Sequence, residues 1–147
     1  MSIKKFYNIA RKKLYPLNRS LTGQGVRDTL NIIKKEFPKL KIIKLKSGKK
    51  VFDWKIPPEW NVSNAYIIDK YNNKIIDFNN NNLHLIGYSI PINRLLSKKE
   101  LLKNLYFLKK QKNAIPYITS YYKRRWGFCI SYKQFKIIDK KYSSDDN

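Results

Sequence analysis

Apolar residues change their spacing along this chain at about residue 40, and this change limits the folds available to it. Before that point they recur every three or four residues, which is the spacing of one helix face. The positions concerned are Ile3, Phe6, Tyr7, Ala10, Leu14, Val26, Leu30, Ile33 and Phe37. The pattern predicts a helix over residues 2–14 and a second helix that ends before Pro38, with Thr22 as its N-cap.

Beyond residue 40, short runs of apolar residues alternate with polar ones, which is typical of β-strands with one buried face. Residues 40–45 and 51–56 flank a turn at 47–50, and this arrangement predicts a hairpin. A second hairpin is expected from residues 65–69 and 74–78, and a further strand from 83–90. Residues 46 to about 93 are therefore expected to form a compact β unit.

The last third of the chain returns to mixed structure. Ser97 and Glu100 form a capping-box pattern ahead of a leucine-rich helical stripe that runs to Leu108. Residues 115–121 and 126–130 are expected to be extended core segments. A second capping box, Ser131 with Gln134, predicts a short helix to residue 138, and residues 140–147 are expected to fray.

This order of elements predicts an α/β fold in which a small β-rich domain interrupts a larger domain whose second part is missing. The predicted parts are a helical segment over residues 1–45, an inserted β-rich domain with a following helix over 46–112, and a return to the interrupted domain over 113–147.

The formal net charge of +22 raises the possibility of a nucleic-acid partner, because basic proteins gain affinity for phosphate backbones by releasing counterions. Lysine outnumbers arginine by 26 to 6, however, and base contacts favour arginine. The lysines are also scattered along the chain rather than gathered in one basic arm. The composition therefore disfavours a nucleic-acid partner.

The chain has one cysteine, so no internal disulfide is possible, which fits a reducing compartment. No run approaches the ~20 apolar residues of a membrane span. The first residues lead into an amphipathic pattern rather than a signal peptide. We therefore expect a cytoplasmic protein without a membrane span.

Arg124 and Arg125 stand beside Trp126, and this group is the first candidate for ligand binding. Two guanidinium groups next to an aromatic face could hold a carboxylate or a phosphate. The alternative is structural, with an arginine that pairs with an internal carboxylate or covers the tryptophan.

His84 and Arg19 are two further substrate-binding candidates, and each has a structural alternative. His84 lies among apolar neighbours in a predicted strand, where a hydrogen-bonded structural histidine is the alternative. Arg19 lies between the two predicted helices, where it could bind an anion or satisfy the carbonyls that end the first helix.

The residue types do not indicate a metal site or a nucleophilic centre. A hydrolytic zinc site needs about three protein ligands and an open water position. The chain has one histidine and ten acidic residues, which form no recognisable ligand set. Cys129 has apolar neighbours and is expected to be a buried thiol.

Several aromatic-rich blocks carry a family resemblance through nearly the whole chain. They are YPLNRSLTG (15–23), GVRDTL (25–30), KVFDW (50–54), IPPEWN (56–61), NLHLIGYS (82–89), AIPYITSYY (114–122) and YYKRRWGFC (121–129). In this order and spacing they resemble a family of bacterial zinc aminopeptidase-like proteins that are often encoded among surface-polysaccharide genes.

The resemblance implies a zinc-aminopeptidase-like α/β domain that is interrupted early by a small β domain and followed by a winged-helix domain. It also implies that this chain is an N-terminal fragment, with the missing C-terminal part of the same protein as its partner. The family's zinc ligands would come from later blocks, so no catalytic or metal-binding residue is assigned here, and no cofactor is expected in this chain. A peptide-like or sugar-amide substrate is expected for the full-length form.

The alternative is a standalone, non-catalytic module that binds a glycan or an acidic partner. Extensive exposed apolar surface would count against this alternative, because a split α/β domain leaves one face uncovered.

Overall fold

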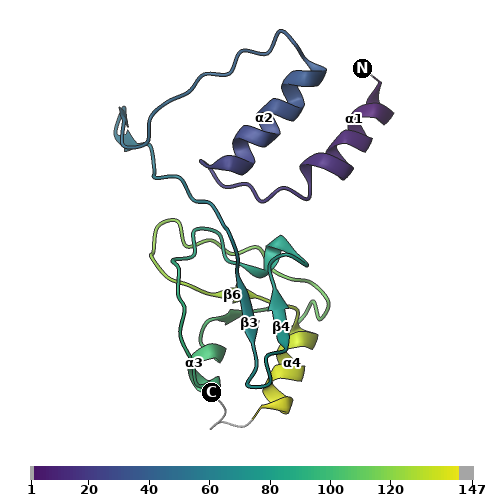
Figure 1. The fold of residues 1–147 in the computed structure, drawn as a ribbon, viewed down its shortest axis with the longest axis vertical. Coiled ribbons are helices and arrows are strands. Elements are labelled where there is room, and N and C mark those ends of the chain that lie inside the picture. Colours follow the sequence, from purple (N-terminus) through teal and green to yellow (C-terminus); the bar gives the residue numbers. More distant parts are fainter. Residues whose placement is uncertain (1, 143–147) are drawn as a thin grey trace. The chain divides into compact units, whose positions relative to one another are not determined.

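The computed structural model describes residues 2–142 and shows a mixed α/β protein with short helices and small two-stranded sheets (Figure 1). The chain divides into two compact units, Met1–Val62 and Ser63–Asn147, called unit 1 and unit 2 below. The α/β prediction is thus confirmed at this level. The boundaries expected after residues 45 and 112 stay predictions.

Unit 1 begins with two helical elements that follow one another directly, α1 (Ile3–Ile9) and η1 (Ala10–Leu14). η1 is a π-helix, which has wider turns than an α-helix. The amide of Tyr15 accordingly donates to the carbonyl of Ala10, five residues earlier, at 2.9 Å. A second helix, α2, spans Gln24–Glu36. Both predicted helices are confirmed, because their apolar spacing is a local signal.

The predicted cap of α2 is wrong. The hydroxyl of Thr22 donates to the carbonyl of Pro58 at 3.0 Å, and Gly23 occupies the cap position. The first amide of the helix, that of Gln24, is instead satisfied by Asn61 Oδ1 at 2.7 Å. Residues distant in sequence therefore cap this helix, which a local pattern does not reveal.

The start of α2 lies against the preceding turn so closely that only glycine fits. A Cβ atom on Gly25 would lie 1.9 Å from the carbonyl oxygen of Asn18. Nearby, Arg27 makes a two-pronged ion pair with Glu59, with distances of 2.5 and 2.8 Å. Both contacts hold α2 to other parts of unit 1.

The first predicted hairpin forms with different strands. β1 (Lys50–Val51) pairs with β2 (Trp54–Lys55), so the turn that joins the two strands lies at residues 52–53, and the turn at 47–48 precedes β1. Residues 40–45 form no strand. Phe52 takes the left-handed conformation needed for this tight turn, with φ of 54°.

Unit 2 contains the second predicted hairpin, which is confirmed. β3 (Tyr66–Ile68) pairs antiparallel with β4 (Lys74–Asp77), with a shift in register after Ile67. A parallel pair, β5 (Leu105–Tyr106) with β6 (Phe128–Cys129), forms a second small sheet.

The strand expected over residues 83–90 is wrong. Asn81 accepts a hydrogen bond from the amide of Leu83 and begins the short 3₁₀-helix η2 (Asn82–His84). Beyond it the chain makes only isolated bridges, from Leu85 to Phe128 and from Gly87 to Thr119. An asparagine side chain that bonds the backbone two residues on favours such a turn over a strand.

Two short helices complete unit 2, α3 (Lys98–Leu102) and α4 (Tyr132–Lys141). Ser97 and Ser131 cap them as predicted, and the full capping box forms at α4. The helical stripe expected to reach Leu108 is wrong, because α3 ends at Leu102 and the chain continues into β5.

At α3 the predicted capping box is incomplete, because the carboxylate of Glu100 pairs with Arg94. The fraying expected from residue 140 is wrong for Lys140 and Lys141, which lie in α4, and residues 143–147 lie outside the described part.

The core of unit 2 is small and consists of side chains from β4, β5, β6, α4 and the short link between β6 and α4. Its buried members are Ile76, Leu105, Phe128, Ile130 and Ile138. Ile130 is completely buried, and its amide donates to the carbonyl of Tyr106 at 2.9 Å. A segment from each end of unit 2 thus meets in one cluster.

Replacing Ile130 with alanine is expected to destabilise unit 2 by about 2 to 5 kcal/mol, because it leaves a cavity in a small core. Ile137→Ala is the matched control, since Ile137 lies in the nearby helix α4 and is exposed; its effect should stay within about 0.5 kcal/mol. Amide hydrogen exchange of the whole chain measures both and separates the two units. Equal protection in both variants would contradict this account of the core.

Candidate functional site

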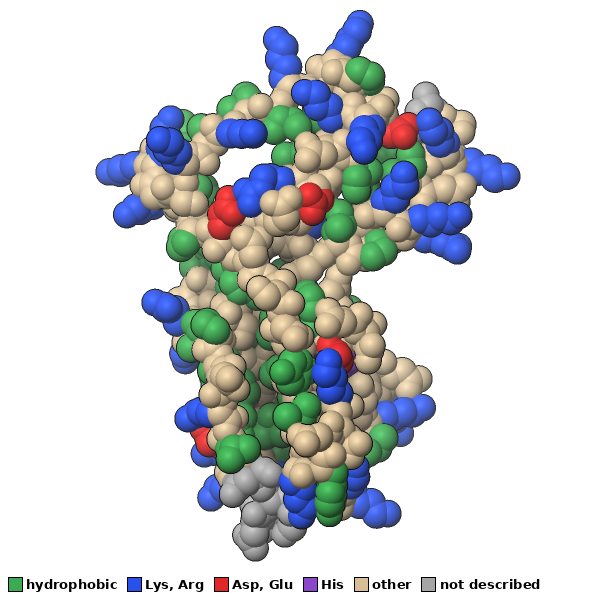
Figure 2. Space-filling view, in the orientation of Figure 1, with side chains coloured by type: hydrophobic (Ala, Val, Ile, Leu, Met, Phe, Trp, Pro, Cys, Tyr) green, Lys and Arg blue, Asp and Glu red, His purple; other side chains and the backbone are tan. Residues whose placement is uncertain are grey.

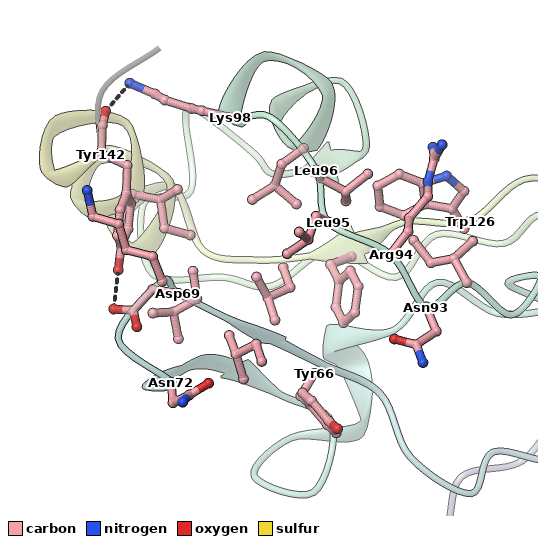
Figure 3. Close-up of a pocket in the computed structure, with 18 residues that line it drawn as sticks. Tyr66, Asp69, Asn72, Asn93, Arg94, Leu95, Leu96, Lys98, Trp126 and Tyr142 are labelled. Carbon is pink, nitrogen blue, oxygen red and sulfur yellow. Dashed lines mark hydrogen bonds between the residues drawn. The ribbon is translucent and has the colours of Figure 1, made fainter. Parts of the chain in front are cut away.

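Unit 2 contains a groove of about 580 Å³. In the part of Figure 2 that unit 2 occupies, hydrophobic side chains gather along this hollow. One wall is β3 with Asp69, and the other is the extended segment 92–96 (Figure 3). The interior is apolar and is lined by Ile75, Leu101, Trp126, Phe128 and Ile138. A volume of this size suits a small ligand or a short peptide segment.

Asp69 lies at one end of the groove, where it collects hydrogen bonds from several donors. Its Oδ1 accepts from the amides of Tyr71 and Asn73, each at 2.9 Å. Its Oδ2 accepts from the hydroxyl of Tyr142 at 3.0 Å and from the side-chain amide of Asn73 at 3.2 Å. Lys141 adds an ion pair at 3.4 Å. The carboxylate is thus fully used in joining the β3–β4 turn to the end of α4.

These contacts determine how Asp69 titrates. Burial alone raises the pKa of its carboxyl, because it disfavours the charged form, but the hydrogen bonds from Asn73, Tyr142 and Tyr71 act more strongly in the opposite direction. The net effect holds the pKa of Asp69 well below its usual range. Asp69 is therefore a charged structural acceptor and not a general acid.

Lys98 lies at the same end and holds the C-terminus of α4. Its Nζ donates to the backbone oxygens of Asp139 at 2.6 Å and Tyr142 at 2.7 Å, as Figure 3 shows for Tyr142. An ammonium group at a helix C-terminus satisfies carbonyls that have no partner within the helix. The groove end is therefore built from β3, α3 and α4 together.

The opposite end of the groove carries Asn93, Arg94 and Trp126 (Figure 3). Arg94 is exposed and pairs with Glu100. Three cationic side chains line the groove, those of Lys70, Arg94 and Lys98. Asp69 is the single acidic residue among the lining residues, and its charge is already matched by donors. A ligand in the groove therefore meets an apolar interior and a rim of mainly basic side chains, of which Arg94 pairs with Glu100 and Lys98 with Asp139.

The predicted group Arg124, Arg125 and Trp126 divides in the structure. Trp126 lines the groove and packs against the core. Arg124 is exposed and does not line the groove. The guanidinium of Arg125 lies over the ring of Tyr106, 5.1 Å from its centroid, and donates to the carbonyl of Thr119 at 3.3 Å. Arg125 thus covers a tyrosine rather than the tryptophan.

Gly127 explains why Arg125 and Tyr106 can meet. A Cβ atom at Gly127 would lie 2.6 Å from the ring of Tyr106, so a larger residue would displace that ring. The Trp-Gly pair in the sequence therefore serves packing in this part of unit 2. Whether Arg124 or Arg125 contacts a substrate stays a prediction.

His84 and Arg19 have structural contacts of the kind given above as alternatives. His84 is buried, and its Nδ1 lies 2.7 Å from the carbonyl oxygen of Cys129. Arg19 lies in unit 1, and its Nη1 donates to the carbonyl of Leu14 at 2.7 Å, at the end of η1. Neither residue lines the groove, and a substrate-binding role for either stays a prediction.

The groove residues that sequence reasoning missed are Tyr66, Asp69, Asn93, Arg94, Lys98 and Tyr142. They come from separate segments, and most carry no chemical signal of their own. Asp69 does carry a sequence signal, because an aspartate shortly before Asn72 and Asn73 is typical of a turn that an aspartate side chain stabilises.

The described residues do not fit a zinc centre. Residues 2–142 contain no group of three or more histidine, cysteine, aspartate or glutamate side chains that could hold a metal ion. The single histidine is bonded to a backbone carbonyl, and Asp69 is saturated by protein donors. No catalytic step is therefore derived through a metal on these residues.

Comparison with known families decides the classification. Residues 59–144 match the family described as Domain of unknown function (DUF2172), which is more than half of the chain. The chain belongs to this family. The match covers most of unit 2, including both walls of the groove.

A curated relative and a solved crystal structure both come from Clostridium acetobutylicum. The chain is 44% identical over 137 residues to a "Putative polysaccharide biosynthesis protein with aminopeptidase-like domain", an alignment that covers 92% of this chain and 31% of the relative. The crystal structure of a "putative peptidase" matches with a TM-score of 0.88 at 43% identity, covering 97% of this chain and 32% of that one. The chain thus spans about a third of the length of each, and the family resemblance read from the sequence is confirmed.

Among the described residues, no helix is long and apolar enough to cross a membrane.

Acid should weaken unit 2 through Asp69. Because its pKa is lower in the folded chain than in the unfolded one, this carboxylate stabilises the fold above the unfolded pKa of about 4. The contribution is lost as pH falls through the folded pKa. We expect Asp69→Asn to lower stability at pH 7 and to reduce its dependence on pH below about 5. Asp53→Asn, which changes an exposed residue of unit 1, is the control. Urea unfolding between pH 2.5 and 7 tests this, and a pH dependence unchanged in Asp69→Asn would contradict it.

Cys129 should be inert in the folded chain. It is completely buried, and burial raises the pKa of its thiol to about 11 despite opposing effects from the Ile118 backbone and Arg125. At pH 7.5 the reactive thiolate is then rare, and the thiol is also inaccessible. A disulfide reagent such as dithionitrobenzoate is expected to label the native chain at least a hundredfold more slowly than the chain unfolded in guanidinium. Comparable rates in both states would show that this segment is open.

Proposed function

We propose that this chain is the N-terminal part of a zinc-dependent aminopeptidase-like hydrolase, and that it is inactive alone. The observation that carries the proposal is the 44% identity over 137 residues to a protein named for an aminopeptidase-like domain, of which this chain spans 31%. In this proposal, unit 1 belongs to the peptidase domain and the β-rich part is inserted into it. Zinc and the residues that bind it lie in the part that this chain does not span.

The surface of unit 1 supports this proposal. Many large apolar side chains of unit 1 are exposed, among them Ile3, Phe6, Leu21, Phe37, Ile43, Leu45 and Phe52. Ile3 is 90% exposed and Phe52 is 92% exposed. So many exposed apolar side chains mark a surface that other protein parts cover. The missing part of the same protein is the partner that we propose for unit 1.

The proposed reaction of the full-length form is hydrolysis of a peptide-like or sugar-amide bond. Residues outside this chain would hold the zinc, which would supply Lewis-acid chemistry for that hydrolysis. This chain would contribute the scaffold and substrate contacts, with Arg124 or Arg125 as a candidate clamp for a substrate carboxylate. We also propose a cytoplasmic location, in keeping with a single, buried cysteine; cell fractionation tests it.

A chimera tests the hydrolase proposal. This chain replaces the matching third of the Clostridium acetobutylicum relative, and the intact relative is the positive control. We expect the chimera to release the N-terminal residue of fluorogenic peptide or sugar-amide substrates at a rate within about tenfold of the relative. Activity should disappear with a zinc chelator and return with zinc, and the 147-residue chain should be inactive.

Two results would contradict this proposal. Activity of the relative that resists chelation would remove the zinc assignment. An active relative with an inactive but folded chimera would show that this chain cannot serve as the corresponding part of that hydrolase.

A second candidate function concerns unit 2 and is favoured by its groove. In this proposal unit 2 is a non-catalytic binding module for a glycan or an acidic partner. Its small but closed core and its positive, apolar groove support binding, whereas the exposed apolar surface of unit 1 argues against the whole chain being such a module. Binding by the 147-residue chain without turnover is the expected result.

A further inference from the structure

We propose that the groove of unit 2 binds an extended acidic peptide, which adds to the free edge of β3 as a third strand. The inference rests on the binding-module candidate above and assigns its ligand class. It does not depend on hydrolysis, so the hydrolase proposal can fail or hold separately.

The free edge follows from the pairing of β3. The amide of Phe78 donates to the carbonyl of Ala65 at 2.9 Å, and Tyr66 lies opposite Asp77. In an antiparallel ladder, a residue between two hydrogen-bonded pairs directs its own amide and carbonyl away from the partner strand. The amide and carbonyl of Tyr66 therefore face away from β4, along the wall of the groove. Within residues 2–142, β4 is the one strand that pairs with β3, so the edge to which they point carries no further strand.

The opposite wall has the same character. Pro91 precedes it, and within the described part of the chain no backbone–backbone hydrogen bond reaches residues 92–96. Leu95 is 87% exposed, although it lines the groove with Leu96. Figure 3 shows this segment facing β3 across the groove. An open strand edge beside an apolar trough is the arrangement by which proteins take up an extended peptide.

The geometry favours a peptide over a glycan. A glycan needs a dense set of side-chain donors and acceptors for its hydroxyls, whereas this interior is made of Ile75, Phe128 and Ile138. An extended peptide instead offers main-chain groups to β3 and alternate side chains to the apolar interior. Because β3 is only three residues long, the strand fixes one or two peptide residues, and the apolar interior must supply the remaining binding energy.

The charge of the groove selects an acidic peptide. Basic residues outnumber acidic ones along it: Lys70, Arg94 and Lys98 line it, with Arg94 paired to Glu100 at the exposed rim and Lys98 paired to Asp139, while Asp69 is saturated by donors. The chain as a whole carries a formal charge of +22. Carboxylates on the outward-facing positions of a peptide therefore complement this rim.

The probe is a short blocked peptide of alternating valine and glutamate, titrated into the full 147-residue chain by fluorescence anisotropy. We expect saturable binding at one site, with changes in the amide resonances of β3. Two N-methylated peptides, one methylated at the valines and one at the glutamates, separate strand addition from simple burial. Either the valine amides or the glutamate amides face β3. The peptide that is methylated at those amides should bind at least tenfold more weakly than the parent peptide.

Two variants provide the matched test on the protein. Tyr66→Pro removes the outward amide of an edge strand while leaving the β3–β4 bonds intact. Tyr66→Ala removes the same side chain and keeps the amide. We expect Tyr66→Pro to bind the peptide about fivefold to tenfold more weakly than Tyr66→Ala. The glutamine version of the peptide should bind more weakly than the glutamate version, with a smaller dependence on salt.

Several results would overturn the inference. Strand addition would be excluded if both N-methylated peptides bound as tightly as the parent peptide. It would also be excluded if the two Tyr66 variants bound the parent peptide equally. Equal binding of the glutamine peptide would exclude the acidic preference. Displacement of the peptide by neutral oligosaccharides would assign the groove to a glycan and leave the binding module standing. A dimer in sedimentation that takes up no peptide and that Tyr66→Pro dissociates would assign the groove to a second copy.

Discussion

The carboxylate of Asp69 holds together the parts of unit 2 that form the groove. It lies one residue after β3, and it accepts hydrogen bonds from the turn that leads into β4 and from Tyr142 at the end of α4. Because the donors come from segments about seventy residues apart, closing this contact fixes a long loop. Lys98 bonds the same end of α4 from α3. One wall of the groove is thereby held to the two helices beneath it.

The elements that the sequence reveals are those whose bonds are local. The β3–β4 hairpin and the capping box of Ser131 with Gln134 involve neighbouring residues, so their pattern is sufficient. The parallel pairing of β5 with β6 joins residues far apart, and it withdraws Leu105 from the helix that its spacing indicates. Burial of Leu105 against Phe128 and Ile130 outweighs its helical propensity.

The candidate site was harder to predict than the fold. Arg124, Arg125 and Trp126 attract attention because guanidinium and aromatic groups often bind ligands, yet Arg125 lies over Tyr106 and only Trp126 reaches the groove. The groove itself is made of ordinary apolar residues and of an unpaired strand edge. An unpaired amide has no signature in a sequence, since every residue except proline carries one.

The two units differ in the surfaces that they expose. Unit 1 exposes large side chains such as Ile3, Ile43 and Phe52 over several of its segments, so only a broad protein surface can cover them. Unit 2 buries its own core and leaves a narrow trough with an open strand edge. A folded domain fits the first requirement, and an extended segment fits the second. We therefore propose that unit 1 packs against a folded domain and that unit 2 takes up an extended segment.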